Sequence, residues 1–270
     1  MELNRIYNED CLVGMKEIPD GTVDCVICDL PYGTTSCAWD SVIPFEPLWE
    51  QYHRICKDTA PIILFGSQPF TSMLISSNIS QFREELCWLK NKPASGFSKD
   101  SKHLKLHENI IVFSKSGKPT FNPQKWLVDK KEFLTQRKTF KDNEFIGNNI
   151  YGSMHRTRPQ EDGTRYPISV VCAKIPHCQS YSKEYKSDLD QRFHPTQKPV
   201  ELIRYLVRTY SNPGDTILDN CMGSGTTAVA AVLETRKFIG FETDKDYFDK
   251  ANARLKQLTG PFYIYGNIGV

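Results

Sequence analysis

Two short turns, far apart in the sequence, carry side chains that could do chemistry. In the first, Asp29, Leu30, Pro31 and Tyr32 follow the apolar run at residues 22–28. A carboxylate and a rigidly aimed backbone carbonyl can accept hydrogen bonds from the exocyclic amine of a base, and Pro31 would fix the turn that aims the Leu30 carbonyl. Tyr32 offers a ring on which a base taken out of a duplex can stack. Because such a turn is equally well explained as an ordinary turn after a strand, it needs support from elsewhere in the sequence.

The second turn runs from Asp219 to Thr227 with the sequence DNCMGSGTT, and it also follows an apolar run. Its glycines let the backbone approach a ligand closely, and its threonines open a predicted helix. Glu242 ends the next apolar run, where a carboxylate can accept hydrogen bonds from both hydroxyls of a ribose. The turn lacks the lysine of a phosphate-binding loop and departs from the GxGxxG spacing of dinucleotide-binding proteins. A nucleoside with a small charged tail, such as S-adenosylmethionine, is therefore the expected ligand.

Both turns resemble motifs of one protein family. DLPYG resembles the DPPY motif of amino-methylating DNA methyltransferases, and DNCMGSGTT resembles their S-adenosylmethionine motif, often written DPFxGSGTT. Residues 194–207, HPTQKPVELIRYLV, are similar to the segment that precedes the cofactor motif in the permuted members called the β class. The order of the three motifs, with the catalytic motif first, is that of this class. The resemblance implies an enzyme that flips a base out of double-stranded DNA and methylates it with S-adenosylmethionine.

The resemblance also implies roles for individual residues. Asp29, Leu30, Pro31 and Tyr32 would be catalytic, and Asp29 would also lie close to the cofactor. The other cofactor-binding residues that it implies lie in the N-terminal turn, in the segment before the cofactor motif, and in that motif with the acid after it: Asp10 and Cys11; His194, Thr196, Gln197 and Lys198; Asp219, Gly223, Ser224, Gly225, Thr226 and Glu242. Trp88 and Lys90 are candidates for the wall of the flipped-base pocket, although a tryptophan in such a strand is more commonly a core residue.

The residue at position 29 bears on which base is methylated. In the family, cytosine-N4 enzymes often carry serine here and adenine-N6 enzymes usually aspartate, so Asp29 favours adenine N6 and leaves cytosine N4 open. Cytosine C5 is disfavoured because that reaction needs a cysteine nucleophile, and Cys37 lacks the expected preceding proline. Leu30 stands where the family often has proline, and residues 220–222 replace its Pro-Phe-x. The motifs are also compatible with methylation of RNA or of a protein amide, and with a non-catalytic DNA-binding protein that keeps the fold.

The elements around these motifs predict an α/β fold. Buried strands are expected at 22–28, 60–66 and 215–219, and helices at 44–58, 68–82 and 200–211. Residues 85–92 and 108–115 read as a strand pair, expected to be antiparallel because their connection is polar and carries no convincing helix. Since parallel strands carry ligand sites at their carboxyl ends, both turns should meet at one edge of the sheet. We expect a Rossmann-like methyltransferase fold, with a mostly parallel sheet and helices on both faces.

The middle of the chain differs from the two ends in composition and in charge. Residues 115–192 are polar and rich in turn residues, and are predicted to form a target-recognition insertion in a catalytic domain made of residues 1–114 and 193–270. Between residues 88 and 198 there are 21 Lys and Arg against 11 Asp and Glu, a net charge of +10, which leaves 13 against 21, or −8, for the rest. A basic centre is typical of a chain that contacts DNA phosphates, although a solvated lysine-rich surface would give the same count.

Composition indicates a cytoplasmic protein. The chain of 270 residues opens without a signal-like segment and contains no long apolar stretch. Its nine cysteines are scattered, which favours reduced thiols over a disulfide framework, and no metal is expected. Cys25 and Cys28 form a CxxC, but a strand would point them to opposite faces. A homodimer and a companion restriction endonuclease are expectations that follow from the resemblance alone.

Overall fold

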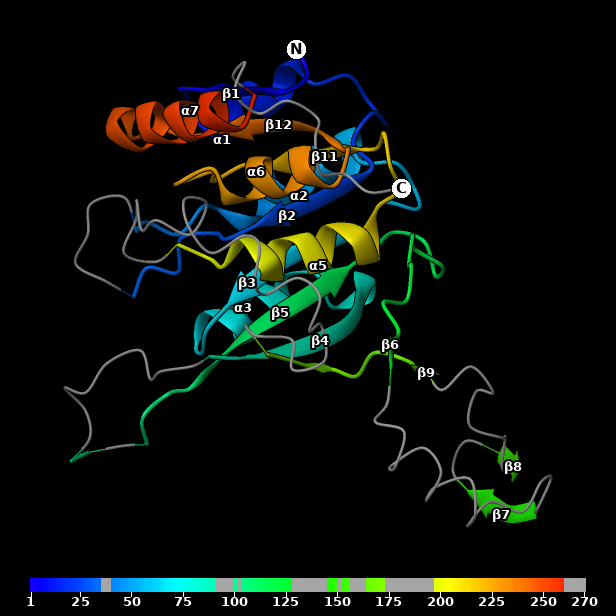
Figure 1. Cartoon of the computed structure of the whole chain (residues 1–270). Coiled ribbons are helices and arrows are strands. Elements are labelled where there is room, and N and C mark those ends of the chain that lie inside the picture. Colours follow the sequence, from blue (N-terminus) through cyan, green and yellow to red (C-terminus); the bar gives the residue numbers. More distant parts are fainter. Residues whose placement is uncertain are drawn as a thin grey trace.

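A single large sheet organises the part of the chain that the structure describes. The computed structural model describes residues 1–34, 40–90, 100–101, 103–127, 145–149, 152–155, 164–172 and 197–259. The main sheet (Figure 1) has eight strands, which in spatial order are β1 (Arg5–Tyr7), β12 (Lys237–Phe241), β11 (Thr216–Asp219), β2 (Cys25–Cys28), β3 (Ile62–Gly66), β5 (His107–Phe113), β4 (Phe82–Leu89) and β10 (Val170–Cys172). The helices are α1 (Cys11–Gly14), η1 (Met15–Glu17), α2 (Phe45–Ile55), α3 (Phe70–Ser77), η2 (Ile79–Gln81), α5 (Val200–Tyr210), α6 (Thr226–Leu233) and α7 (Lys245–Thr259).

The sheet is mostly parallel, as predicted. The strands from β1 through β12, β11 and β2 to β3 are all parallel to their neighbours. Strands that are covered on both faces are apolar throughout, and β2 and β3 are buried at every position. β5 runs antiparallel to both β3 and β4, which confirms the predicted antiparallel pair. The predicted α/β class is therefore confirmed.

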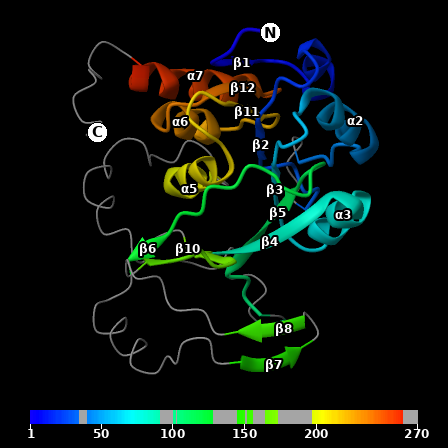
Figure 2. The ribbon, with the colours of Figure 1, turned by 90° about the vertical axis from the view of Figure 1, so that its right-hand side faces the viewer.

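Helices cover both faces of this sheet. Figure 2 shows α5, α6 and α7 on one face and α1, α2 and α3 on the other. Cys25 packs in one core cluster with Leu206 of α5, whereas Cys28 packs in a second cluster with Tyr52 of α2 and Phe70 of α3. The two cysteines of the CxxC sequence therefore point to opposite faces of β2, as expected for a strand.

One strand of the main sheet comes from the predicted insertion. β10 pairs in parallel with β4, with Val170 opposite Cys87. Earlier in the same segment, the backbone N–H of Asn122 donates to the carbonyl of Thr209, at the end of α5, over 2.6 Å. Two small antiparallel sheets lie between these contacts in the sequence: β6 (Trp126–Leu127) with β9 (Thr164–Arg165), and β7 (Phe145–Asn149) with β8 (Gly152–His155). The domain division at residues 115 and 192 stays a prediction.

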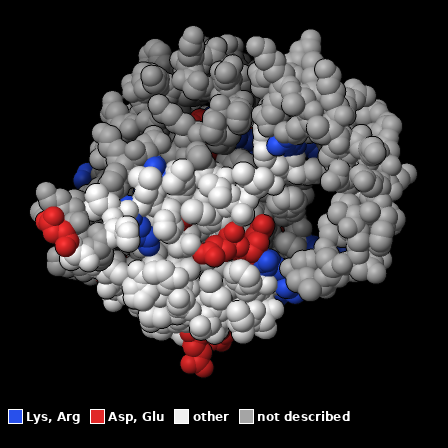
Figure 3. All heavy atoms as spheres, turned by 90° about the horizontal axis from the view of Figure 1, so that it is seen from below, with Lys and Arg blue, Asp and Glu red and all other residues white. Residues whose placement is uncertain are grey.

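One face of the described residues is mixed in charge. Seen from below, lysines and arginines of the described residues lie at several separate places, and so do acidic side chains (Figure 3). Much of the basic middle of the sequence lies outside the described residues, so its role in DNA binding stays a prediction. Within the described ranges, no helix combines the length and the apolar character needed to cross a membrane.

Candidate active site

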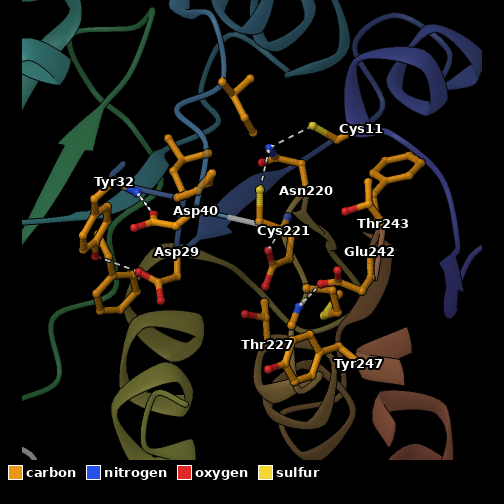
Figure 4. A pocket seen from close by; sticks show the side chains of 18 of the residues that line it. Cys11, Asp29, Tyr32, Asp40, Asn220, Cys221, Thr227, Glu242, Thr243 and Tyr247 are labelled. Carbon is orange, nitrogen blue, oxygen red and sulfur yellow. Dashed lines mark hydrogen bonds between the residues drawn. The ribbon is translucent and has the colours of Figure 1, made fainter. Parts of the chain in front are cut away.

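The two predicted turns open into one cavity at the carboxyl ends of β2 and β11. These strands are parallel neighbours, with Leu218 opposite Val26, so the residues that follow them meet at the same edge of the sheet. The cavity has a volume of about 480 Å³, which is within the range of small-molecule sites. Asp29 and Tyr32 lie on one side of it and Glu242 on the other (Figure 4). The expectation that the two turns come together is confirmed.

Asp29 is held in place by two donors. The Tyr32 hydroxyl donates to Oδ1 over 2.7 Å, and the Lys198 ammonium donates to Oδ2 over 2.5 Å. Burial, with the nearby carboxylates of Asp29 and Glu108, raises the pKa of Tyr32 well above its ordinary value, so the phenol keeps the proton that it donates. The Asp29 side chain is 28% exposed, against 8% for Lys198. The carboxylate therefore lines the cavity with its orientation held by two donors, and its ammonium partner is largely buried beside it.

Lys198 belongs to a chain of four alternating charges. Its Nζ lies 3.2 Å from Oε2 of Glu108, and Glu108 also pairs with Lys90. Burial alone would lower the pKa of Lys198, but the carboxylates of Asp29 and Glu108 raise it above its ordinary value. Burial likewise opposes ionisation of Glu108, yet Lys198 and Lys90 bring its pKa below the ordinary value. Both members of the buried pair Lys198 and Glu108 are therefore charged.

Asp40 braces the first turn from the side. Its Oδ1 accepts hydrogen bonds from the backbone N–H groups of Tyr32 (2.8 Å) and Gly33 (2.9 Å), and its Oδ2 accepts one from Thr34 (2.9 Å). Gly33 has a φ of +66°, in the left-handed region that favours glycine. We did not predict Asp40, because no spacing in the sequence indicates which carboxylate accepts from the N–H groups of a turn.

Replacement of Asp40 by alanine is expected to lower kcat about tenfold, since three aligned N–H groups lose their acceptor and the turn loosens around Asp29. The affinity for S-adenosylmethionine, measured by calorimetry, should change little. Asp40→Asn, which keeps one acceptor oxygen, is the matched control and should lose less. Full activity of Asp40→Ala would show that Asp40 has no part in holding the turn.

The second turn is shaped by two glycines. Gly223 and Gly225 have φ values of +53° and +77°, which other residues rarely adopt. The backbone N–H of Gly223 donates to Oε2 of Glu242 over 2.7 Å, and that of Asp244 donates to Oε1 over 2.8 Å. A β-carbon added at Gly223 would meet no atom within 4 Å, so the backbone there is open to an incoming ligand. The Glu242 carboxylate is thus held rigidly beside an accessible loop.

Asp219 lies beneath this loop. Its Oδ1 accepts a hydrogen bond from the backbone N–H of Cys221 over 3.1 Å. Burial raises the pKa of Asp219 to about 6, even though hydrogen bonds from Thr227 and Cys221 act in the opposite direction. Asp219 therefore binds a proton more readily in the folded protein than an exposed aspartate does.

Asp219→Asn is expected to flatten the pH dependence of stability. The folded protein takes up a proton at Asp219 at a pH of about 6, whereas the unfolded chain does so only near about 4, so wild-type stability declines as the pH rises through this window. The contribution is on the order of 2 kcal/mol. Urea unfolding of both proteins at pH values from about 4 to about 7 measures it. A constant difference between the two free energies of unfolding across that range would contradict the assignment.

The N-terminal turn reaches the same cavity. Asp10 caps α1, with its Oδ1 accepting from the backbone N–H of Leu12 over 2.8 Å. Cys11 is buried and lies 3.6 Å from Nδ2 of Asn220, whose Oδ1 accepts a hydrogen bond of 2.5 Å from the Tyr52 hydroxyl. Asn220 was noted in the sequence only as a departure from the family motif, and here it ties the cavity floor to α2.

The cavity gathers most of the residues predicted for the site. Those that line it are Asp10, Cys11, Asp29, Leu30, Pro31, Tyr32, Gln197, Lys198, Asp219, Gly223, Ser224, Thr226 and Glu242. Gly225 instead forms the N-cap of α6. His194 and Thr196 lie outside the described residues. Trp88 is buried in the core with its ring edge-on to Phe65, and Lys90 reaches Glu108. The roles of all these residues stay predictions.

Several lining residues were not predicted. They include Asp40, Glu108, Asn220 and Tyr247. Glu108 carried a weak signal, since it is a charged residue near the start of β5, whose last four residues are apolar and buried, and a carboxylate beside a buried core needs a partner. Tyr247 stands in the first turn of α7, and no pattern in the sequence distinguishes it from Phe248, the other aromatic residue of that helix.

The mostly parallel sheet brings an Asp-x-Pro-Tyr turn close to a glycine loop that is followed by an acid. This is the arrangement of a methyltransferase that uses a nucleoside cofactor. The chain matches the DNA methylase family N6_N4_Mtase over residues 23–253, most of its length. It belongs to this family. The predicted enzyme class, a DNA methyltransferase with S-adenosylmethionine as methyl donor, is confirmed by this membership.

Individual relatives are similar along nearly the whole chain. Type II methyltransferase M1.MboII of Moraxella bovis is 27% identical over 281 aligned residues, which cover 96% of this chain and 98% of the relative. DNA adenine methyltransferase YhdJ of Escherichia coli (strain K12) is 27% identical, covering 94% of this chain and 83% of the relative. Among solved structures, the complex of M1.HpyAVI with SAM superposes with a TM-score of 0.59 at 22% identity, covering 93% of this chain and 98% of the other, which shows a shared fold.

Proposed function

We propose that this protein transfers the methyl group of S-adenosylmethionine to N6 of adenine in double-stranded DNA. The observation that carries the proposal is the shared cavity, in which Asp29 of the first turn and Glu242 beside the second turn face the same space. A donor held at the glycine loop and a base held at Asp29 would therefore meet. Both named relatives are methyltransferases by their names, and the name of one of them, YhdJ, specifies adenine in DNA.

The cofactor site is proposed to extend from the N-terminal turn to the glycine loop. Glu242 would bind the ribose hydroxyls, since each of its oxygens accepts one backbone hydrogen bond and keeps a further lone pair. Asp10 and Cys11 would lie near the adenine of the cofactor, and Gly223 would let the loop backbone approach the methionine portion. When bound, S-adenosylmethionine supplies an activated methyl group on a positively charged sulfur.

The acceptor site is proposed to lie at the first turn. Asp29 and the Leu30 carbonyl would accept hydrogen bonds from the exocyclic amine, which directs the nitrogen lone pair toward the methyl group. Tyr32, whose ring stacks on Phe70 at 5.0 Å between centroids, would support the flipped base. The amine nitrogen would displace the sulfur of the bound cofactor from its methyl group in line, so that S-adenosylhomocysteine would be the leaving group and the proton lost by the amine would pass to solvent. Positioning and electrostatic alignment supply the catalysis.

The choice of base is tested by identifying the product. The protein is incubated with S-adenosylmethionine labelled in the methyl group and with unmethylated genomic DNA, and the DNA is then digested to nucleosides. N6-methyldeoxyadenosine is the expected labelled product. N4-methyldeoxycytidine would make cytosine N4 the target in place of adenine N6, and absence of any labelled nucleoside would favour a non-catalytic DNA-binding protein.

Three wider aspects are also proposals. Residues 115–192 would read the target sequence, because the charge excess of the chain lies in and around them. A homodimer and a cognate restriction endonuclease would be the partners, as the resemblance implies. A DNA substrate favours the cytoplasm as the place of action.

A further inference from the structure

We infer that Lys198 is a positioning residue of the acceptor site, whose ammonium aims the Asp29 carboxylate at the amine of the target base, and that Glu108 anchors Lys198 for this task. The inference rests on the proposed role of Asp29. It differs from what the sequence resemblance implies, which is that Lys198 binds the cofactor.

The contacts of the ammonium carry the inference. Nζ of Lys198 lies 2.5 Å from Oδ2 of Asp29 and 3.2 Å from Oε2 of Glu108, and its side chain is only 8% exposed. The ring of Phe65 lies 5.0 Å from Nζ, and the rings of Tyr32 and Trp88 lie 6.0 Å from it. Two carboxylates and three aromatic rings therefore surround this ammonium, and aromatic faces stabilise a cation placed near them.

The balance of charge explains why the cofactor carboxylate is a poor partner for Lys198. Asp29, Lys198, Glu108 and Lys90 alternate in sign along the chain of contacts. A third carboxylate at Lys198 would stand beside two others, or would displace one of them and leave it buried without a cation. Both results are strongly unfavourable. The ammonium of Lys198 is thus paired with the carboxylates of Asp29 and Glu108 before any ligand binds.

The orientation of the Asp29 carboxylate depends on its contact with Lys198. Its two oxygens have one protein partner each among the contacts described above, Tyr32 on Oδ1 and Lys198 on Oδ2. Without the ammonium, a single hydrogen bond would hold the carboxylate, which could then rotate away from the amine. Misplacement of a catalytic group by about 1 Å can cost a factor of about 10² in rate. Loss of the ammonium should therefore act on kcat and spare the affinity for the cofactor.

The test compares Lys198→Met with wild type in the full-length protein. Methionine keeps an unbranched stem and removes only the charged head. The inference expects kcat for DNA methylation, at saturating cofactor and DNA, to fall about 10²-fold, while the Kd for S-adenosylmethionine stays within about threefold. Lys198→Arg, which restores a cation, should recover part of kcat. Lys105→Met is the matched control, because Lys105 bonds Ser67 and not Asp29, and it should keep the wild-type kcat.

Two results would overturn the inference. One is a Kd for S-adenosylmethionine raised tenfold or more in Lys198→Met with kcat retained at saturation, which would place Lys198 on the cofactor. The other is an unchanged kcat and Kd. Because removing one partner of a buried ion pair can impair folding, thermal unfolding of each variant is recorded, and Glu108→Gln serves as a second variant with Lys198 intact. It should lower kcat about tenfold without changing the Kd, and an unchanged kcat would count against the inference.

Failure of this inference can be told apart from failure of the proposed function. A wild-type protein that yields no methylated nucleoside refutes the proposed function. An active wild type with a fully active Lys198→Met variant refutes only the role given to Lys198. A double variant of Lys198 and Glu108 adds a further measurement. If the two residues act as one unit, the loss of kcat in the double variant differs from the sum of the two single losses, expressed as free energies.

Discussion

Asp29→Ala is expected to lower kcat for DNA methylation about 10³-fold, the scale of removing one preorganised hydrogen-bonding group from a reacting centre. Asp29 is the acidic side chain of the first turn that faces the cavity, and alanine leaves the amine of the target base with only the Leu30 carbonyl as acceptor. The measurement is transfer of labelled methyl groups to DNA at saturating cofactor. Binding of S-adenosylmethionine should persist, because Glu242 and the glycine loop on the opposite side of the cavity are untouched.

The control for Asp29→Ala is the same substitution at Asp58. The Asp58 side chain is 91% exposed and pairs with Lys115 at the surface, so its loss should leave the rate near that of wild type. Asp29→Asn provides a graded comparison, because the carboxamide keeps one acceptor oxygen and should lose less activity than alanine does. A full rate in Asp29→Ala would refute the role of this carboxylate.

The meeting of the two turns could be predicted because it follows from local patterns and one rule of topology. β2 and β11 are short apolar runs that end in turn residues, and parallel strands bring their carboxyl ends to one edge. The structure adds that the strands are direct neighbours, with Ile217 opposite Cys25. The helices α2 and α5 were predictable for a similar reason, since each has apolar residues at helical spacing on the side that meets the sheet.

The side-chain contacts that hold the site in place could not be predicted, because they join residues that are separated in the sequence. Lys198 and Asp29 are 169 positions apart, and their ion pair depends on the fold bringing the start of α5 close to the end of β2. Asp40 is only 8 positions from Tyr32, but no pattern in the sequence shows that its carboxylate accepts a hydrogen bond from the N–H group of Tyr32. A sequence shows that a buried carboxylate needs a partner, and it does not show which cation supplies it.

The edge strand β10 was missed for a different reason. It has only three residues, Val170–Cys172, and it lies in a long segment that is mostly polar and rich in turn residues. So short a run carries no periodicity, and its conformation is fixed by pairing with β4. The consequence is functional, since this strand links the region predicted to read DNA to the antiparallel half of the sheet, which also carries Glu108 on β5.

Glu242→Ala is expected to raise the Kd for S-adenosylmethionine about 10²-fold. Hydrogen bonds to a charged group contribute roughly 1.5–3 kcal/mol each, and a tenfold change in Kd corresponds to about 1.4 kcal/mol, so loss of the two ribose contacts accounts for this scale. The substitution also removes the acceptor for the N–H groups of Gly223 and Asp244, which loosens the loop around the ligand. Calorimetric titration with the cofactor measures the effect without DNA.

The comparison with Glu242→Gln separates ribose binding from loop support. Glutamine keeps an acceptor for one of the two backbone N–H groups and can still bond one ribose hydroxyl, so its Kd should lie between those of wild type and alanine. Glu50→Ala, at an exposed position of α2, is the control for removing a carboxylate elsewhere and should bind normally. If Glu242→Ala binds the cofactor as tightly as wild type does, the ribose lies elsewhere in the cavity. The proposed orientation of the cofactor, with its ribose at Glu242 and its methyl group directed toward Asp29, would then be wrong.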